Sequence, residues 1–327
     1  TANTTGTRNV AVGSSSLDAN TTASDNTAVG YNAATAITTG TSNTAIGATA
    51  LGALTTGGRN VALGYYALAL QTDASDNVAV GEYAGGAITT GAYNTLIGGK
   101  AGDGITTAGN NTGLGYRALS APSNAGANNT AVGFDALLSN TTGTENVAVG
   151  AYALDANTTA SNNVAIGKSS LGTNTTGANN VAVGDLALFA NTTASNNVAV
   201  GKSSLGANTT GGANVAVGTS TLTANTTASD NTGLGYAVLM ANTTGTGNTG
   251  VGVNSLQANT TASYNTAVGQ NSLIANTTGA SNVAVGALAL DANTTASNNT
   301  AVGYASLGAN TTGAGNTAVG KDAMIAN

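Results

Sequence analysis

One asparagine returns at every seventeenth position along the chain, and a glycine stands four places after each copy. The series runs from Asn9 to Asn111, gains one extra residue, resumes at Asn129 and continues to Asn316. A fixed period this short indicates stacked copies of one unit, because such a unit is too small to bury a core alone. The spacing predicts an all-β fold, a parallel β-solenoid (β-roll) of about nineteen 17-residue rungs.

The composition fits a thin interior that is repeated many times. Only 6% of the 327 residues are charged, 4% are aromatic and one is proline. These are too few large side chains for an ordinary globular core, while regularly spaced Val and Leu argue against disorder. We expect one continuous repeat domain over residues 1–327, with irregular units at 1–119, a loop insertion at 120–128 and regular units at 129–327. Because both ends fall within a repeat, we expect a piece of a longer protein.

Within each rung, positions are numbered from the recurring asparagine, which is position zero. Positions one to three read β-branched, small, β-branched, as in Val181-Ala182-Val183, and this alternation predicts a short β-strand. The glycine at position four would end the strand at a corner. Position eight is usually Leu, and positions eleven to thirteen usually read Asn-Thr-Thr, which is turn chemistry.

Three rungs exchange volume between positions eight and eleven. Position eight shrinks and position eleven becomes Ile in the pairs Ala34/Ile37, Gly85/Ile88 and Gly102/Ile105. Because packed interiors resist voids, the two positions are expected to share one interior space. We expect the rest of the interior to consist of one Leu and one or two Val in each rung.

The asparagines themselves allow two interpretations. Asparagine is a good turn former, but stacked side-chain amides can also bond from rung to rung as a ladder. We favour a structural ladder at position zero because that position never varies, and we expect position eleven to lie at the edge of the interior. In the regular units the position-zero ladder consists of Asn146, Asn163, Asn180, Asn197, Asn214, Asn231, Asn248, Asn265, Asn282, Asn299 and Asn316.

A larger period, twice as long as the asparagine repeat, is also present. In the regular units the turn alternates between Thr-Thr-Gly and Thr-Thr-Ala-Ser. This alternation could record duplication of a two-unit block, or a full turn of the coil built from two units. We expect one 17-residue unit for each rung.

The composition argues against several functions. The net charge is −6 without any basic stripe, so nucleic-acid binding is not expected. The absence of Cys and His removes the usual thiol nucleophile, the usual general base and the commonest transition-metal ligands. We expect no enzyme activity, no cofactor, no metal and no membrane span in this segment.

Charged and aromatic residues mark the expected outer surface. All charged residues except Asp73 lie at positions five, six, nine and sixteen, which we expect to face solvent or a partner. Aromatic residues gather at positions five and six, in a stripe of Tyr31, Tyr65, Tyr66, Tyr83, Tyr116, Phe134, Tyr152, Tyr236 and Tyr304. Tyrosine suits interfaces and sugar rings, so this stripe is a candidate contact line for a glycan or receptor. The alternatives are packing between subunits and isolated surface residues.

Paired threonines at positions twelve and thirteen are a second repeated surface feature. Flat ranks of Thr could order water, as in an ice-binding protein. However, adjacent residues on an extended strand point opposite ways, so a pair cannot line one flat face. We favour turn chemistry and keep an ice-binding β-solenoid as the alternative function. A tailspike-like protein that binds or cleaves polysaccharide is a further alternative.

Strings such as Asn265-Thr266-Ala267-Val268-Gly269 and Ser-Leu-x-Ala-Asn-Thr-Thr-Gly resemble the head repeats of trimeric autotransporter adhesins. They also resemble repeats in bacteriophage tail fibres and large bacterial surface proteins, and the resemblance covers essentially the whole chain. It implies a left-handed β-roll assembled as a homotrimer outside the cell. Adhesin head repeats are typically shorter than the repeat of this chain, and no stalk, anchor or chaperone domain is seen here.

The expected function is a structural segment of an extracellular fibre or filament with an adhesive or surface-attachment role. The expected partners are further copies of the chain, as a trimer placed end to end within a longer fibre, and a host-surface glycan or protein. The expected location is the cell surface or the surface of a virion. Three copies could bury a shared axis of Ala, Val and Leu, which a thin lone roll would need.

Overall fold

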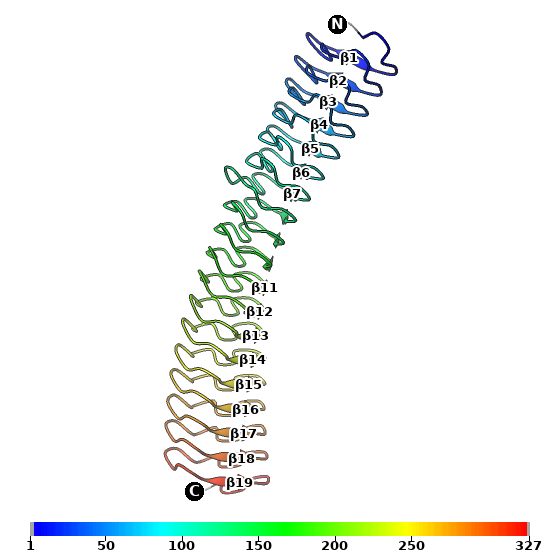
Figure 1. Ribbon diagram of the computed structural model, residues 1–327. Coiled ribbons are helices and arrows are strands. Elements are labelled where there is room, and N and C mark those ends of the chain that lie inside the picture. Colours follow the sequence, from blue (N-terminus) through cyan, green and yellow to red (C-terminus); the bar gives the residue numbers. More distant parts are fainter. Residues whose placement is uncertain (1–2, 326–327) are drawn as a thin grey trace. The chain divides into compact units, whose positions relative to one another are not determined.

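The computed structural model describes residues 3–325, which form an all-β parallel β-solenoid without any helix. Each turn of the solenoid contributes one three-residue strand, in chain order (Figure 1). The chain divides into two compact units, the first ending at Asn163 and the second beginning at Val164. This division lies within the regular repeats and not at the insertion.

The strands recur with the period of the asparagines. Those of the first unit are β1 (Val10–Val12), β2 (Thr27–Val29), β3 (Thr44–Ile46), β4 (Val61–Leu63), β5 (Val78–Val80), β6 (Thr95–Ile97), β7 (Thr112–Leu114), β8 (Thr130–Val132) and β9 (Val147–Val149). Those of the second are β10 (Val164–Ile166), β11 (Val181–Val183), β12 (Val198–Val200), β13 (Val215–Val217), β14 (Thr232–Leu234), β15 (Thr249–Val251), β16 (Thr266–Val268), β17 (Val283–Val285), β18 (Thr300–Val302) and β19 (Thr317–Val319).

Within each unit every strand pairs in parallel with the next, at identical repeat positions. Val181 lies opposite Val198, and Ala182 opposite Ala199. The offset is one repeat throughout, and it grows by one residue only across the insertion, where Thr112 pairs with Thr130. One rung is therefore one 17-residue unit, as predicted, and the longer alternation of the turns does not set the turn of the coil.

The strand turns its alanine inward and its β-branched residues outward. Ala182 and Ala199 are fully buried, whereas the flanking Val181 and Val183 are partly exposed. The expectation that Val fills the interior is wrong. Side chains of a strand alternate between faces, and the interior facing the strand is already occupied by the position-eight Leu, which leaves room only for a methyl group.

The position-eight leucines complete this interior from the turn. Leu188 and Leu205 are fully buried, and their backbones are left-handed, with φ of 51° and 50°. A left-handed backbone is disfavoured for a side chain with a Cβ. The repeated burial of a whole Leu, worth about 1.5–3 kcal/mol per rung, offsets this cost.

The exchange of volume between positions eight and eleven is confirmed, and a third position takes part in it. A Cβ at Gly85 would lie 3.1 Å from Ile88 Cδ1, and one at Gly102 would lie 3.0 Å from Ile105 Cδ1. Leu96, at position two of β6, replaces the usual Ala and would lie within 3.0 Å of both Cβ atoms. One buried Leu thus fills space that two rungs leave empty.

Backbone hydrogen bonds run along the stack outside the strands as well. The amide of Leu188 donates to the carbonyl of Ser204, 2.9 Å away in the next rung. In the turn, the amide of Thr209 donates to Thr226 over 2.8 Å. The polar backbone of a rung is thereby largely paired with its neighbours, as a thin interior requires.

The position-zero asparagines form hydrogen bonds from rung to rung. The backbone amide and the Nδ2 of Asn43 both donate to Oδ1 of Asn26, at 2.9 and 3.1 Å. The same Nδ2 also donates to the carbonyl of Gly57, at position fourteen of its own rung, over 3.0 Å. A position-zero side chain that makes these bonds, as Asn43 does, joins its own turn to the rung before it.

A second ladder runs along position eleven in the regular units. Asn157 Nδ2 donates to Asn140 Oδ1 over 3.0 Å, and Asn208 Nδ2 donates to Asn191 Oδ1 over 3.1 Å. Asn208 Nδ2 also bonds the carbonyl of Gly211 three residues on, which closes a turn. The position-eleven asparagines are buried, so ladder and turn chemistry coexist in one side chain.

Candidate binding surfaces

The outward face of the strands forms an apolar surface in each unit. Positions one and three carry Val, Ile, Leu or Thr, and many of these side chains are more than a third exposed, such as Leu114 at 44% and Leu234 at 49%. Because the register is maintained from strand to strand, these side chains form two parallel files on the sheet. We call this surface the strand face. The sequence does not reveal this surface, because alternation alone does not say which residues point inward.

The predicted aromatic stripe separates into clusters and single residues. Tyr65, Tyr66 and Tyr83 form one cluster, with ring centroids 5.1–5.4 Å apart. In the second cluster, Tyr116 stacks on Phe134 at 5.7 Å, and Phe134 meets Tyr152 edge-on at 5.4 Å. Each cluster spans adjacent rungs, and both clusters belong to the first unit.

The remaining members of the stripe stand apart. Tyr31, Tyr236 and Tyr304 are exposed, and among residues 3–325 no ring contact is found for them. The stripe is therefore not one unbroken contact line. Its two clusters are the parts that could offer a wide aromatic surface to a partner.

Beside the aromatic clusters, the first unit is hollowed along position nine. Three adjoining hollows, of about 480, 340 and 230 Å³, share lining residues. Asp103 lines all three, Ser120 and Pro122 line the first two, and Ala87 lines the second and third. Together they make one surface depression, here called the position-nine groove, which extends over the rungs of β4 to β8.

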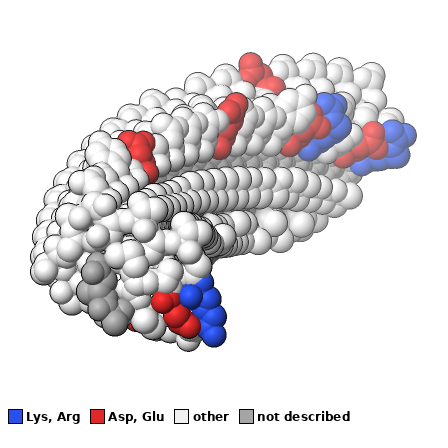
Figure 2. Space-filling model, turned by 90° about the horizontal axis from the view of Figure 1, so that it is seen from below, with Lys and Arg blue, Asp and Glu red and all other residues white. Residues whose placement is uncertain are grey.

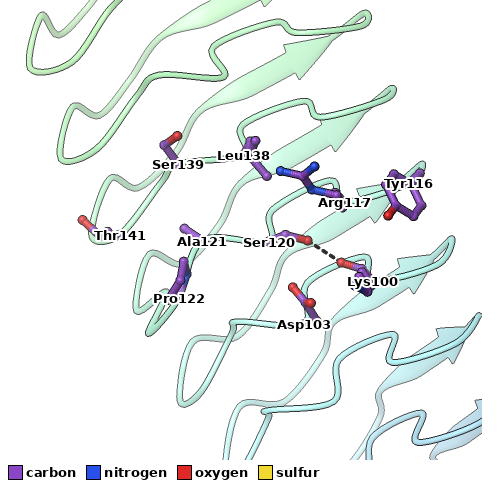
Figure 3. A pocket seen from close by; sticks show the side chains of 10 residues that line it. All are labelled: Lys100, Asp103, Tyr116, Arg117, Ser120, Ala121, Pro122, Leu138, Ser139 and Thr141. Atoms are coloured by element: carbon purple, nitrogen blue, oxygen red, sulfur yellow. Dashed lines mark hydrogen bonds between the residues drawn. The ribbon is translucent and has the colours of Figure 1, made fainter.

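Small residues and the insertion explain why the groove lies here. Position nine is Gly86 in the rung of β5 and Asp103 in the next, and position ten is Ala87 and then Gly104. At the other end, the inserted residues carry Pro122 outward beside Ser120 (Figure 3). The wall is formed by position-six side chains, including Tyr66 and Tyr83 of the predicted aromatic stripe and Arg117, which the sequence places only on the outer surface.

Across the insertion the position-zero ladder continues through one hydrogen bond, from the backbone amide of Asn129 to Asn111 Oδ1 over 2.9 Å. An isolated bridge between Ile105 and Asn124 resumes the stack, and Asn124 Oδ1 accepts the amide of Gly126 over 2.9 Å. The side-chain nitrogens of Asn111 and Asn124 are nevertheless buried without a hydrogen-bond partner. The stack thus tolerates two unsatisfied donors next to the groove, each costing about 1–3 kcal/mol.

Four ionisable groups gather at the groove and its wall. Partial burial raises the pKa of the Asp103 carboxyl, opposed by the Ser120 hydroxyl and the positive charges of Lys100 and Arg117. In Figure 3 Asp103 lies near Ser120, and the Ser120 hydroxyl donates to the Lys100 carbonyl. Arg117 Nε lies 3.5 Å from Asp135 Oδ1. Position six was expected to face solvent or a partner. Asp135 is instead buried, because it packs against the Arg117 guanidinium of the neighbouring rung.

Elsewhere charges form isolated pairs between stacked rungs. Arg8 donates two hydrogen bonds to Asp25, and Arg59 donates two to Asp76, at position sixteen in each case. Hydrogen bonds from these arginines lower the pKa of both carboxyls. On the face drawn in Figure 2, charged side chains stand singly or in oppositely charged neighbours on a largely uncharged surface. No broad field of one sign is seen on that face.

Among residues 3–325 no cluster of three or more Asp, Glu, His or Cys could hold a metal ion. No helix in this part of the chain is long and apolar enough to cross a membrane. The candidate surfaces are therefore the strand face, the aromatic clusters and the position-nine groove.

The sequence matches no protein-family model, and no curated protein matches it either. What defines the protein is its architecture, a parallel β-solenoid with one strand in each 17-residue turn.

Proposed function

We propose that this chain is a structural segment of an extracellular fibre with an adhesive or surface-attachment role and no catalytic activity. It acts on the surface of a cell or a virion. It assembles with copies of itself as a homotrimer, and such trimers continue end to end within a longer fibre. The coil is left-handed in this proposal, as the resemblance to adhesin head repeats implies.

The observation that carries this proposal is the apolar strand face. The apolar core of a rung is small, typically one Leu with two or three Ala, as in Ala148, Ala153 and Leu154, which is a thin core for a chain of this length. The strand face leaves two files of Val, Ile and Leu partly exposed in each unit. Contiguous apolar surfaces of this kind mark association sites in soluble proteins. Three chains that meet through this face would bury both files about one axis.

The attachment role is supported by the aromatic clusters. The cluster of Tyr65, Tyr66 and Tyr83 and that of Tyr116, Phe134 and Tyr152 lie at positions five and six, beyond the corner that ends the strand. They would stay exposed when the strand faces meet. Aromatic side chains with polar tips are favoured in contacts with proteins and sugars.

The mass of the assembly in solution tests this function. Sedimentation equilibrium of the purified chain is expected to give three times the chain mass, and electron microscopy a slender particle. A charge-carrying variant with Val183→Lys, Val200→Lys and Val217→Lys is expected to remain monomeric. The matched control, Thr193→Lys, Thr210→Lys and Thr227→Lys, adds the same charge to the turns of the same rungs and should still assemble. A wild-type chain that stays monomeric at high concentration would exclude the trimer.

A second candidate is ice binding, and the strand face favours that candidate too. Its files of Thr and Val repeat at the same strand positions, unlike the paired threonines of the turns, where a backbone bend separates neighbours. Ice binding requires that face to be free in solution, whereas the fibre buries it. Measurement of thermal hysteresis separates the two, because a fibre segment should show none.

A further inference from the structure

We propose that the position-nine groove binds an oligosaccharide that lies along the stack of rungs. This inference deepens the adhesive part of the proposed function and rests on it. The groove runs from Tyr66 and Leu70 at one end, past Asp103, to Ser139 and Thr141 at the other. Five rungs at a strand spacing of about 4.8 Å give it a length of roughly 20 Å, enough for several linked sugar rings.

The lining changes in character along this length. At the end formed by the rungs of β4 and β5, Tyr66, Tyr83 and Leu70 make an apolar wall, and the rings of Tyr66 and Tyr83 are 5.3 Å apart. At the end formed by the rungs of β7 and β8, Ser120, Ser139 and Thr141 supply hydroxyl groups. A saccharide has this same combination of apolar ring faces and hydroxyl edges, so it can use both ends.

The middle of the groove carries the strongest hydrogen-bonding groups. Asp103 is half-buried on the floor, where its carboxylate can accept from two sugar hydroxyls. Lys100 and Arg117 stand beside it as donors only. Hydrogen bonds to ionised groups are about twice as strong as those between neutral groups. Because Asp103 lines all three hollows, its carboxylate can contact a ligand that is centred in any one of them.

The backbone disfavours an extended peptide as the occupant. Peptide strands usually bind by pairing with free amides and carbonyls. Along this groove the amide of Gly102 donates to Ala118, that of Lys100 to Glu82 and that of Gly86 to Tyr83. Free amides remain at position ten of the groove, as at Ala87 and Gly104, but each rung offers only one, so a bound peptide would not find the consecutive donors and acceptors that strand pairing needs.

A shorter depression at the same repeat positions shows what opens such grooves. In the second unit, Phe189, Gly206 and Ala207 line a hollow of about 250 Å³, again with glycine at position nine. It lacks any carboxylate or cationic side chain among its lining residues. The position-nine groove of the first unit therefore differs from it by its charged middle and its length.

An oligosaccharide array, followed by titration calorimetry with the best ligand, tests the assignment. Affinity is expected to rise from mono- to about tetrasaccharide and then level off, as five rungs predict. Asp103→Asn, which keeps the shape of the floor, should weaken binding roughly tenfold or more. Ala87→Phe, which fills the groove, should abolish it.

The matched control is Ala258→Phe, the same substitution at position ten of a rung outside both depressions. It should bind like the wild type, and circular dichroism shows that all variants keep the fold. No saccharide binding by the wild-type chain, or binding untouched by Asp103→Asn and Ala87→Phe, overturns the proposal. Binding of extended peptides with the same sensitivity to both variants overturns it in favour of a peptide groove. Sedimentation equilibrium of the same samples measures the mass of the assembly, which tests the proposed fibre function independently of saccharide binding.

Discussion

The side-chain amides of Asn129 and Asn140 donate to the same carbonyl oxygen, that of Gly143, each over 2.9 Å. The first belongs to the position-zero ladder and the second to the position-eleven ladder, so the two ladders meet at position fourteen of this rung. The carbonyls of Ala160 and Ala228 accept the same two kinds of donor in later rungs. The ladders therefore act as one buried polar network, in which most side-chain amides have a defined partner and Asn111 and Asn299 are the exceptions among the position-zero asparagines described.

Removal of one ladder amide should be costly. In Asn214→Ala the amide of Asn231 loses its acceptor, Asn214 Oδ1, 3.0 Å away, and Ala228 loses one of its two side-chain donors. We expect the free energy of unfolding to fall by roughly 2–4 kcal/mol, because buried polar groups are stranded and a cavity forms. Urea denaturation measures this. Gln270→Ala removes an exposed amide and should stay within about 0.5 kcal/mol of wild type; equal losses in the two variants would contradict the role of the ladder.

The corner glycine at position four should not tolerate a side chain. Gly201 has φ of +130°, and a Cβ there would lie 2.6 Å from the carbonyl carbon of Gly218 in the next rung. We expect Gly201→Ala to cost about 3 kcal/mol or more, since strain and overlap add. Gly99→Ala is the matched control, because its Cβ would only touch the Tyr116 ring at 3.5 Å. Thermal denaturation of both variants measures the loss of stability. A Gly201→Ala variant as stable as wild type would refute the steric argument.

Leu96 should be the most sensitive core residue of its region. It fills the space beside Gly85 and Gly102, so Leu96→Ala leaves a cavity that glycines cannot close, and we expect a loss of about 3–5 kcal/mol. Adding Gly102→Leu restores the usual Ala and Leu of a rung and should recover part of that loss. The recovery is incomplete because the space beside Gly85 stays empty. Denaturant midpoints of the single and double variants measure this, and no recovery would mean that the two positions do not share one space.

Much of the fold follows from the sequence because the repeat multiplies each signal. The strand at positions one to three, the corner at position four and the 17-residue rung are each predicted from short-range chemistry. The inward side of the strand is not, because Val181-Ala182-Val183 alternates equally well in either direction. Only the position-eight Leu, which competes for the same interior, decides that Ala182 points in and leaves the strand face apolar.

The position-nine groove was beyond sequence analysis for a different reason. Gly86, Asp103 and Pro122 are individually ordinary surface residues, and their effect depends on stacking in adjacent rungs. A signal was present, since position nine carries no large apolar side chain in the four rungs before the single insertion. This signal can be used only when the register of the rungs across the insertion is known. The structure supplies that register through the pairing of Thr112 with Thr130.

Asp155 should make stability depend on pH in a definite direction. Burial raises the pKa of its carboxyl above the ordinary 3.8, against the opposing hydrogen bonds from its own amide and that of Ala156. Between the unfolded and the raised folded pKa, the folded state binds more protons than the unfolded state, so stability falls as pH rises through this window. At pH 7 the whole cost is present, and well below the ordinary value it is absent.

Asp155→Asn removes this cost, because an amide oxygen can still accept the two backbone hydrogen bonds. We expect the variant to unfold at higher denaturant concentration than wild type at pH 7, and the difference to vanish in strong acid. Asp18→Asn, at the same repeat position but exposed, is the control and should change little at either pH. The Arg8–Asp25 and Arg59–Asp76 pairs also lose their stabilising effect as pH falls, because the pKa values of both carboxyls are lowered in the folded state. This loss is the same in the variants and in wild type, so it cancels when they are compared at one pH. A gain from Asp155→Asn that is equal at both pH values would show that burial of the charge is not its cause.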